Sequence, residues 1–162
     1  MKDLKTQIQS VVDIYKSGNL KEAELLSKKL ITKNPKIVFL YNLLGLIFMG
    51  QKKIDQAKKC YEKGIKIDPS FGMIYNNLGL LFFKNKTTDN IKKAENFYKK
   101  SISLDRKIPE PHNNLGSLYD YLYKVEDAID CYKKAIDINP KLSYAHHNLG
   151  AAYVSIGKFN EA

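Results

Sequence analysis

The fold is decided by residues 38–71, which read VFLYNLLGLIFMGQKKIDQAKKCYEKGIKIDPSF. Apolar residues recur there at three- and four-residue spacing in two runs, separated by the polar residues 51–53 and ended by Asp68-Pro69. Such spacing is typical of amphipathic helices. The stretch therefore predicts two antiparallel helices joined by a short turn.

Small residues repeat this pattern along the chain with a step of 34 and one step of 37. The two series are Gly45, Gly79, Gly116, Gly150 and Ala23, Ala57, Ala94, Ala128, Ala162. A period of this size predicts a solenoid of helical pairs, in which each unit packs on its neighbours. We expect one array with units at residues 4–37, 38–71, 72–108, 109–142 and 143–162.

The repeated glycine indicates close helix packing. Glycine inside a helix costs about 0.5–1 kcal/mol relative to alanine, so its recurrence needs a structural reason. We expect Gly45 to face Ala57, where a larger side chain would force the helices apart.

Three units depart from the common pattern. The first has Ser10-Val11 in place of Leu-Gly, which is typical of a degenerate N-terminal capping repeat. The third has three additional residues between Lys84 and Asn90, which we interpret as a longer turn tolerated in the packing, with a contact site as the alternative. The last ends at Ala162, and we expect an apolar edge at Leu149 and Tyr153 that could pair with another copy of the chain.

The units resemble the tetratricopeptide repeat. The residues that carry the resemblance are Tyr41, Leu44-Gly45, Phe48, Ala57, Tyr61, Gly64 and Pro69, and again His112, Leu115-Gly116, Tyr119, Ala128, Tyr132, Ala135 and Pro140. The resemblance implies an all-α fold, a right-handed α-α superhelix of antiparallel helix pairs. It also implies that first helices line a concave groove and second helices form the convex back.

Asparagines mark the expected groove. Asn77, Asn114 and Asn148 precede Leu-Gly in three successive units, and Asn42, Asn76 and Asn113 stand on the inward stripe. A side-chain amide has two donors and two acceptor lone pairs, so a row of amides can bond a peptide backbone. The row resembles the asparagine rows of O-GlcNAc transferases, which favours peptide contact. The alternative is that the amides bond neighbouring helices and set the repeat geometry.

The predicted groove contacts also include the apolar residues Phe39, Met73, Leu80 and Phe83 at one end and the polar residues Asp120 and Tyr121 at the other. We therefore expect a protein-interaction scaffold whose groove holds an extended peptide or a helix of a partner. The alternative is the substrate-recognition arm of a larger glycosyl-, sulfo- or methyltransferase. A chaperone carboxylate clamp is excluded, because Ile8, Asn42, Asn76, Asn113 and His147 occupy the position of its leading lysine.

The chain has a net charge of +10. Most lysines alternate with the apolar positions of second helices, which favours a solvated back over a nucleic-acid surface. These lysines are Lys58, Lys59, Lys63, Lys66, Lys92, Lys93, Lys99, Lys100, Lys133 and Lys134.

Other chemistry is not indicated by the sequence. Cys60 and Cys131 stand at one place in repeats two apart, so we expect packed thiols and no disulfide. His112 and His146 take an aromatic position of the repeat, which favours packing over metal binding. No nucleophile with an adjacent base, phosphate loop or zinc spacing is present, so we expect no enzyme activity, metal or cofactor in this chain. With no signal peptide or membrane-spanning segment, the cytoplasm is the expected location.

Overall fold

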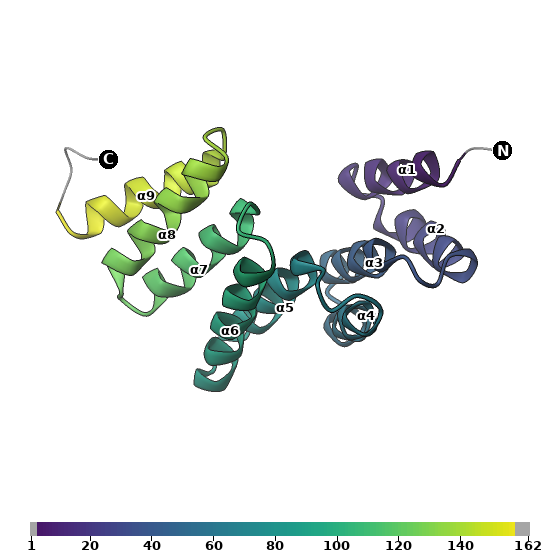
Figure 1. Ribbon diagram of the computed structural model, residues 1–162, viewed down its shortest axis with the longest axis horizontal. Helices are drawn as coiled ribbons and strands as arrows, with labels where there is room; N and C mark the ends of the chain where they lie inside the picture. The colour runs from purple at the N-terminus through teal and green to yellow at the C-terminus, as the bar shows by residue number, and fades with distance from the viewer. Residues whose placement is uncertain (1–2, 158–162) are drawn as a thin grey trace. The chain divides into compact units, whose positions relative to one another are not determined.

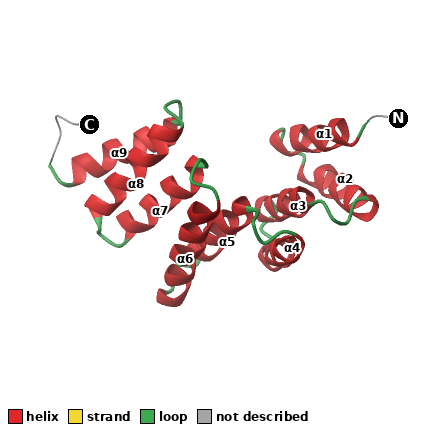
Figure 2. Ribbon diagram, in the orientation of Figure 1, coloured by secondary structure: helices red, strands yellow, loops and turns green. Residues whose placement is uncertain are grey.

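The computed structural model describes residues 3–157, and within them every regular element is a helix (Figures 1 and 2). The elements are α1 (Leu4–Lys16), α2 (Leu20–Lys33), α3 (Val38–Gly50), α4 (Ile54–Ile67), α5 (Gly72–Lys84), α6 (Thr88–Leu104), α7 (Pro109–Tyr121), α8 (Val125–Ile138) and α9 (Ser143–Ser155). The predicted all-α class is confirmed. No helix among these residues is long and apolar enough to cross a membrane. Ala162 lies outside the described residues.

The chain divides inside α5 into two compact units, Met1–Asn77 and Leu78–Ala162, here called unit 1 and unit 2. In unit 1, each of the helices α1 to α4 packs on the next one along the chain. In unit 2 the same holds for α6 to α9. Both units are therefore built from antiparallel neighbours, as the helical pairing in the sequence predicts (Figure 1).

A glycine on the first helix of a repeat packs against a tyrosine ring on the second. A Cβ added to Gly45 would lie 2.7 Å from Cδ1 and from Cζ of Tyr61. The equivalent pairs are Gly79 with Tyr98 and Gly116 with Tyr132. Close packing at the glycines is thus confirmed, but the expectation that Ala57 is the opposing group is wrong. The long ring reaches into the space that glycine leaves, while Ala57 is buried one turn earlier on α4.

In the first repeat, the larger residue of this pair is on the first helix and the smaller one is on the second. Val11 takes the glycine position and Ser27 takes the tyrosine position, and both are buried. A larger residue on the first helix thus accompanies a smaller one on the second. The departure from Leu-Gly at Ser10-Val11 is therefore a compensated packing change.

The additional residues of the third repeat lengthen a helix. The turns at residues 17–19, 51–53, 85–87 and 122–124 all have three residues. By contrast, α6 has 17 residues where α2, α4 and α8 each have 14. The expected longer turn is therefore wrong. Thr87 is the reason, because its hydroxyl accepts a hydrogen bond from the backbone N–H of Asn90 at 3.3 Å and so caps a helix that begins early.

The apolar edge expected at Leu149 and Tyr153 is largely covered. Tyr153 is buried and packs with Ala128 and Ile129 of α8, and Leu149 is partly buried against the same cluster. The expectation of an exposed apolar edge is therefore wrong for Tyr153, because α8 packs against its ring.

The glycine–tyrosine contact predicts opposite effects at two glycines. Gly45→Ala should lower the free energy of unfolding by about 1–3 kcal/mol, because the added methyl group meets the Tyr61 ring. Gly150→Ala should raise it by about 0.5–1 kcal/mol through helix propensity, because an added Cβ would meet no described side chain or neighbouring helix within 4 Å. Urea denaturation measures both. A loss of equal size at the two positions would contradict the packing role.

The tyrosine hydroxyls predict a second contrast. Among the described residues, the Tyr61 hydroxyl is buried without a hydrogen-bond partner, whereas the Tyr132 hydroxyl donates to Oδ2 of Asp120 at 2.8 Å. Tyr61→Phe should therefore be neutral or slightly stabilising, and Tyr132→Phe should cost about 1 kcal/mol. Thermal and urea unfolding of the two variants provide the measurement. Equal effects would show that the Asp120 bond adds nothing.

Candidate partner-binding surface

The predicted groove residues lie on the first helices of the repeats, and we call the side of these helices that carries them the first-helix face of each unit. In unit 1 the face comprises Phe39 and Asn42 on α3, and Met73, Asn76 and Asn77 on α5. In unit 2 it comprises Leu80 and Phe83 on α5, Asn113, Asn114 and Tyr121 on α7, and Asn148 on α9.

The asparagines bond one another between successive first helices. In unit 1, Nδ2 of Asn77 donates to Oδ1 of Asn42 at 2.8 Å. In unit 2, Nδ2 of Asn148 donates to Oδ1 of Asn113 at 3.0 Å, which joins α9 to α7 in the same way. Each bond spans 35 residues, one more than the repeat. The offset of 35 residues is the sequence signal for this pairing. The pairing was not predicted, because the two asparagine positions of the repeat were interpreted as unrelated.

Burial limits which amides a ligand could reach. Asn42, Asn76, Asn77 and Asn113 are buried, and Asn76 also donates to Oδ1 of Asn77 at 3.4 Å. The bonds between helices correspond to the alternative in which the amides set the repeat geometry. Asn114 and Asn148 are partly exposed and are the members of the row that remain accessible.

Exposed apolar side chains collect on the first helices. Within residues 3–157, five of the seven large exposed apolar residues belong to these helices, with exposed fractions from 38% to 49%: Met73, Leu80, Tyr121, Tyr144 and Val154. Phe39 and Phe83 are partly buried. The other two exposed residues are Leu25 and Tyr123. Four of the five residues on first helices belong to unit 2, and burying such side chains against a partner would be favourable.

One charged residue of this surface was not singled out by sequence. The rings of Phe83 and Tyr121 meet edge to face with centroids 5.8 Å apart. Nζ of Lys86 stands over both rings, 5.4 Å from the centroid of Phe83 and 4.3 Å from that of Tyr121. The sequence signal for this contact was a lysine, Lys86, three residues after Phe83. The second ring, that of Tyr121, belongs to the next repeat, so the pattern within one repeat did not reveal it.

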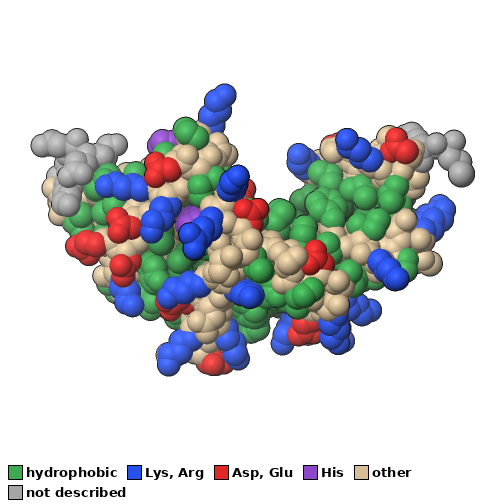
Figure 3. Space-filling view, in the orientation of Figure 1, with side chains coloured by type: hydrophobic (Ala, Val, Ile, Leu, Met, Phe, Trp, Pro, Cys, Tyr) green, Lys and Arg blue, Asp and Glu red, His purple; other side chains and the backbone are tan. Residues whose placement is uncertain are grey.

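The lysines predicted on second helices are all exposed on α4, α6 and α8, where blue side chains project from the surface (Figure 3). Several of them pair with acidic neighbours one turn away, as Lys93 does with Asp89 and Lys99 with Glu95. Exposed pairs of this kind mainly maintain solubility. Their position agrees with the predicted solvated surface.

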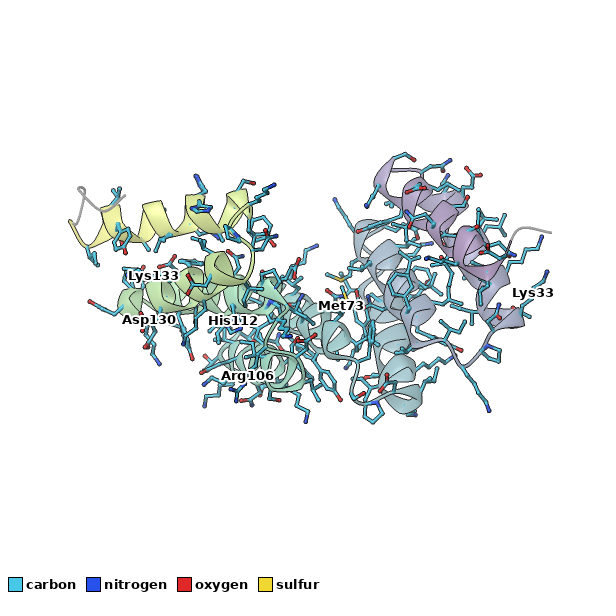
Figure 4. The ribbon with its side chains drawn as sticks, turned by 45° about the horizontal axis from the view of Figure 1, so that its top comes forward. Lys33, Met73, Arg106, His112, Asp130 and Lys133 are labelled. Atoms are coloured by element: carbon cyan, nitrogen blue, oxygen red, sulfur yellow. The ribbon has the colours of Figure 1, made fainter. Side chains whose placement is uncertain are left out.

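The histidines act as structural residues of the repeat. Tyr75 donates its hydroxyl to the carbonyl oxygen of Pro69 at 3.0 Å, and Nε2 of His146 lies 2.9 Å from that of Pro140. His112, close to Arg106 in Figure 4, makes the same contact with the Arg106 backbone. Burial lowers the pKa of His112. Among the described residues, no cluster of His, Cys, Asp or Glu could hold a metal ion.

The cysteines are buried free thiols. Cys60 and Cys131 are each exposed by less than 10%, and neither forms a disulfide within the described residues. Burial raises the pKa of both thiols to about 11. Both are therefore protonated at neutral pH, as expected for packing residues.

Solved structures share this arrangement of helices. A crystal structure of MamA is 24% identical, with a TM-score of 0.71, and the match covers 99% of this chain and 89% of that chain. TTC0263, a thermophilic TPR protein of Thermus thermophilus, is 20% identical with a TM-score of 0.81, covering 94% of this chain and 82% of that one. The first TPR of Spaghetti (RPAP3), bound to the HSP90 peptide SRMEEVD, is 22% identical with a TM-score of 0.66, covering 74% and 93%. No curated protein matches the chain.

Family models match three stretches of the sequence. Two described as tetratricopeptide repeat match residues 38–71 and 73–108, and one described as TPR repeat matches residues 124–162. Together these stretches cover more than half of the chain, and they agree with the glycine–tyrosine packing and the helical pairs. The chain is therefore built of tetratricopeptide repeats.

Proposed function

We propose that the first-helix faces bind an extended segment or a helix of a partner protein, so that the chain acts as a protein-interaction scaffold. The observation that carries this proposal is the collection of exposed apolar side chains on first helices, including Met73 in unit 1 and Leu80 and Tyr121 in unit 2. The exposed sides of the second helices are, by contrast, rich in lysine. An apolar surface with polar surroundings is typical of a protein contact.

The accessible amides have a secondary role in this proposal. Asn114 and Asn148 are partly exposed on the same first helices, and a side-chain amide has donors and acceptors of the kind that bond a peptide backbone. The buried asparagines support them by joining successive first helices. Recognition of substrates for a transferase is a narrower form of the same function and would use the same surface.

Double substitution of the apolar face tests the proposal. Peptides are first selected from a displayed random library on the wild-type chain. Leu80→Ser with Tyr121→Ser should weaken their binding by about tenfold or more, because two central apolar contacts are lost. Fluorescence anisotropy with labelled peptides measures the affinity, and circular dichroism checks that the variant is folded.

Leu25→Ser is the matched control, because Leu25 is 68% exposed but lies on the second helix α2. It should leave peptide affinity unchanged. The proposal is wrong if both variants bind equally well, if both lose affinity equally, or if selection enriches no peptide above a bare support.

A further inference from the structure

The aromatic rings of Phe83 and Tyr121 hold the Lys86 ammonium at a defined place in unit 2. Its two ring distances, 5.4 Å and 4.3 Å, are both within the range of a cation–π interaction. An ammonium has three N–H donors and no acceptor, and the two ring faces do not satisfy all three donors. We call Leu80, Phe83, Lys86 and Tyr121 the Lys86 patch.

The turn before α6 gives Lys86 this position. The equivalent turn residues Gly18, Lys52 and Tyr123 have positive φ values of 84°, 62° and 57°. Lys86 does not share this left-handed conformation, because the early start of α6 changes the turn. The backbone N–H of Thr87 bonds the Asn85 carbonyl at 2.7 Å, which makes the turn compact. The lysine is thus placed by the feature that distinguishes the third repeat.

In unit 1, the two lysines over the Phe48 ring are neutralised by one carboxylate. Lys28 and Lys53 stand over Phe48 at 5.5 Å and 5.6 Å, and both pair with Glu24 at 2.5 Å and 3.0 Å. Hydrogen bonding to Lys28, with a further contribution from Lys53, lowers the pKa of Glu24 to about 2. The carboxylate therefore stays ionised and satisfies these two lysines.

Lys86 has no such partner among the described carboxylates. Asp89 pairs with Lys93 at 2.5 Å. Asp120, adjacent to Tyr121 in the sequence, accepts the Tyr132 hydroxyl at 2.8 Å. In a chain whose net charge is already +10, the patch thus presents an ammonium that no described carboxylate contacts within ion-pair distance.

We propose that the Lys86 patch binds an acidic segment of the partner protein, in which a carboxylate lies beside an apolar side chain. The carboxylate pairs with Lys86, and the apolar side chain packs on Leu80 and Tyr121, which are 38% and 41% exposed. Two features of the patch select this chemistry: a fixed cation supplies the charge contact, and the exposed apolar atoms beside it supply burial. The positive charge of the whole chain favours the approach of an acidic partner.

This inference rests on the proposed function, and its test separates the two. The random peptide library is selected in parallel on wild type and on Lys86→Met, which retains an unbranched apolar side chain without the charge. Peptides from the wild type should be enriched in Asp or Glu next to aliphatic or aromatic residues. They should bind Lys86→Met about tenfold more weakly, and Lys86→Arg should retain most of the affinity. Anisotropy at low and high salt should show weaker binding as salt increases.

Lys92→Met is the matched control, since Lys92 is an exposed lysine on α6 of the same unit. It should bind the selected peptides as the wild type does. The inference is overturned, while the proposed function stands, if the peptides lose affinity for Leu80→Ser with Tyr121→Ser but show no acidic enrichment. Equal binding to wild type and Lys86→Met also overturns it. A single-stranded oligothymidine that binds in a Lys86-dependent manner, in place of acidic peptides, would assign the patch to nucleic acid.

Discussion

The contact between a helical glycine and a buried tyrosine ring is the constraint on which each repeat depends. Gly45 and Tyr61 show it in unit 1, and Gly116 and Tyr132 show it in unit 2. A planar ring of this size fits between two helices only where one backbone lacks a Cβ, so the glycine and the tyrosine require each other. The exchange to Val11 with Ser27 in the first repeat supports this view, because the larger and smaller residues change places together.

As a result of this packing, each side of the first helix makes a different kind of contact. The glycine side is occupied by the second helix of the same repeat. Successive first helices are joined by asparagine bonds, as between Asn77 and Asn42 or between Asn148 and Asn113. The remaining positions make neither of these contacts, and the exposed apolar residues lie there. A surface can vary for a partner only where the scaffold does not need it, which is why we propose the first-helix face as the binding site.

Periodicity explains why most of the fold could be predicted from the sequence. A step of 34 residues specifies the helical pairs and the place of Gly45 within them, because each repeat is an independent statement of the same pattern. Interactions between repeats were harder to predict from the sequence. The Asn42–Asn77 bond has an offset of 35 residues and appears only when neighbouring helices are placed side by side. The early start of α6 depended on one capping residue, Thr87, inside a stretch that otherwise resembles a polar turn.

The chemistry of the proposed binding face is linked to the buried core beneath it. Phe83 and Asp120 occupy equivalent positions in the third and fourth repeats. Asp120 accepts the Tyr132 hydroxyl, whereas the equivalent Tyr98 hydroxyl has no partner among the described residues. The acidic Asp120 therefore accompanies a tyrosine whose hydroxyl is hydrogen-bonded, whereas the aromatic Phe83 accompanies a tyrosine whose hydroxyl has no partner among the described residues. Asp120 lies next to Tyr121 in the sequence, but among the described residues it forms no ion pair with Lys86 and accepts the Tyr132 hydroxyl. One side chain, Asp120, thus stabilises the core of unit 2 through Tyr132 while lying on the face that is proposed to bind a partner.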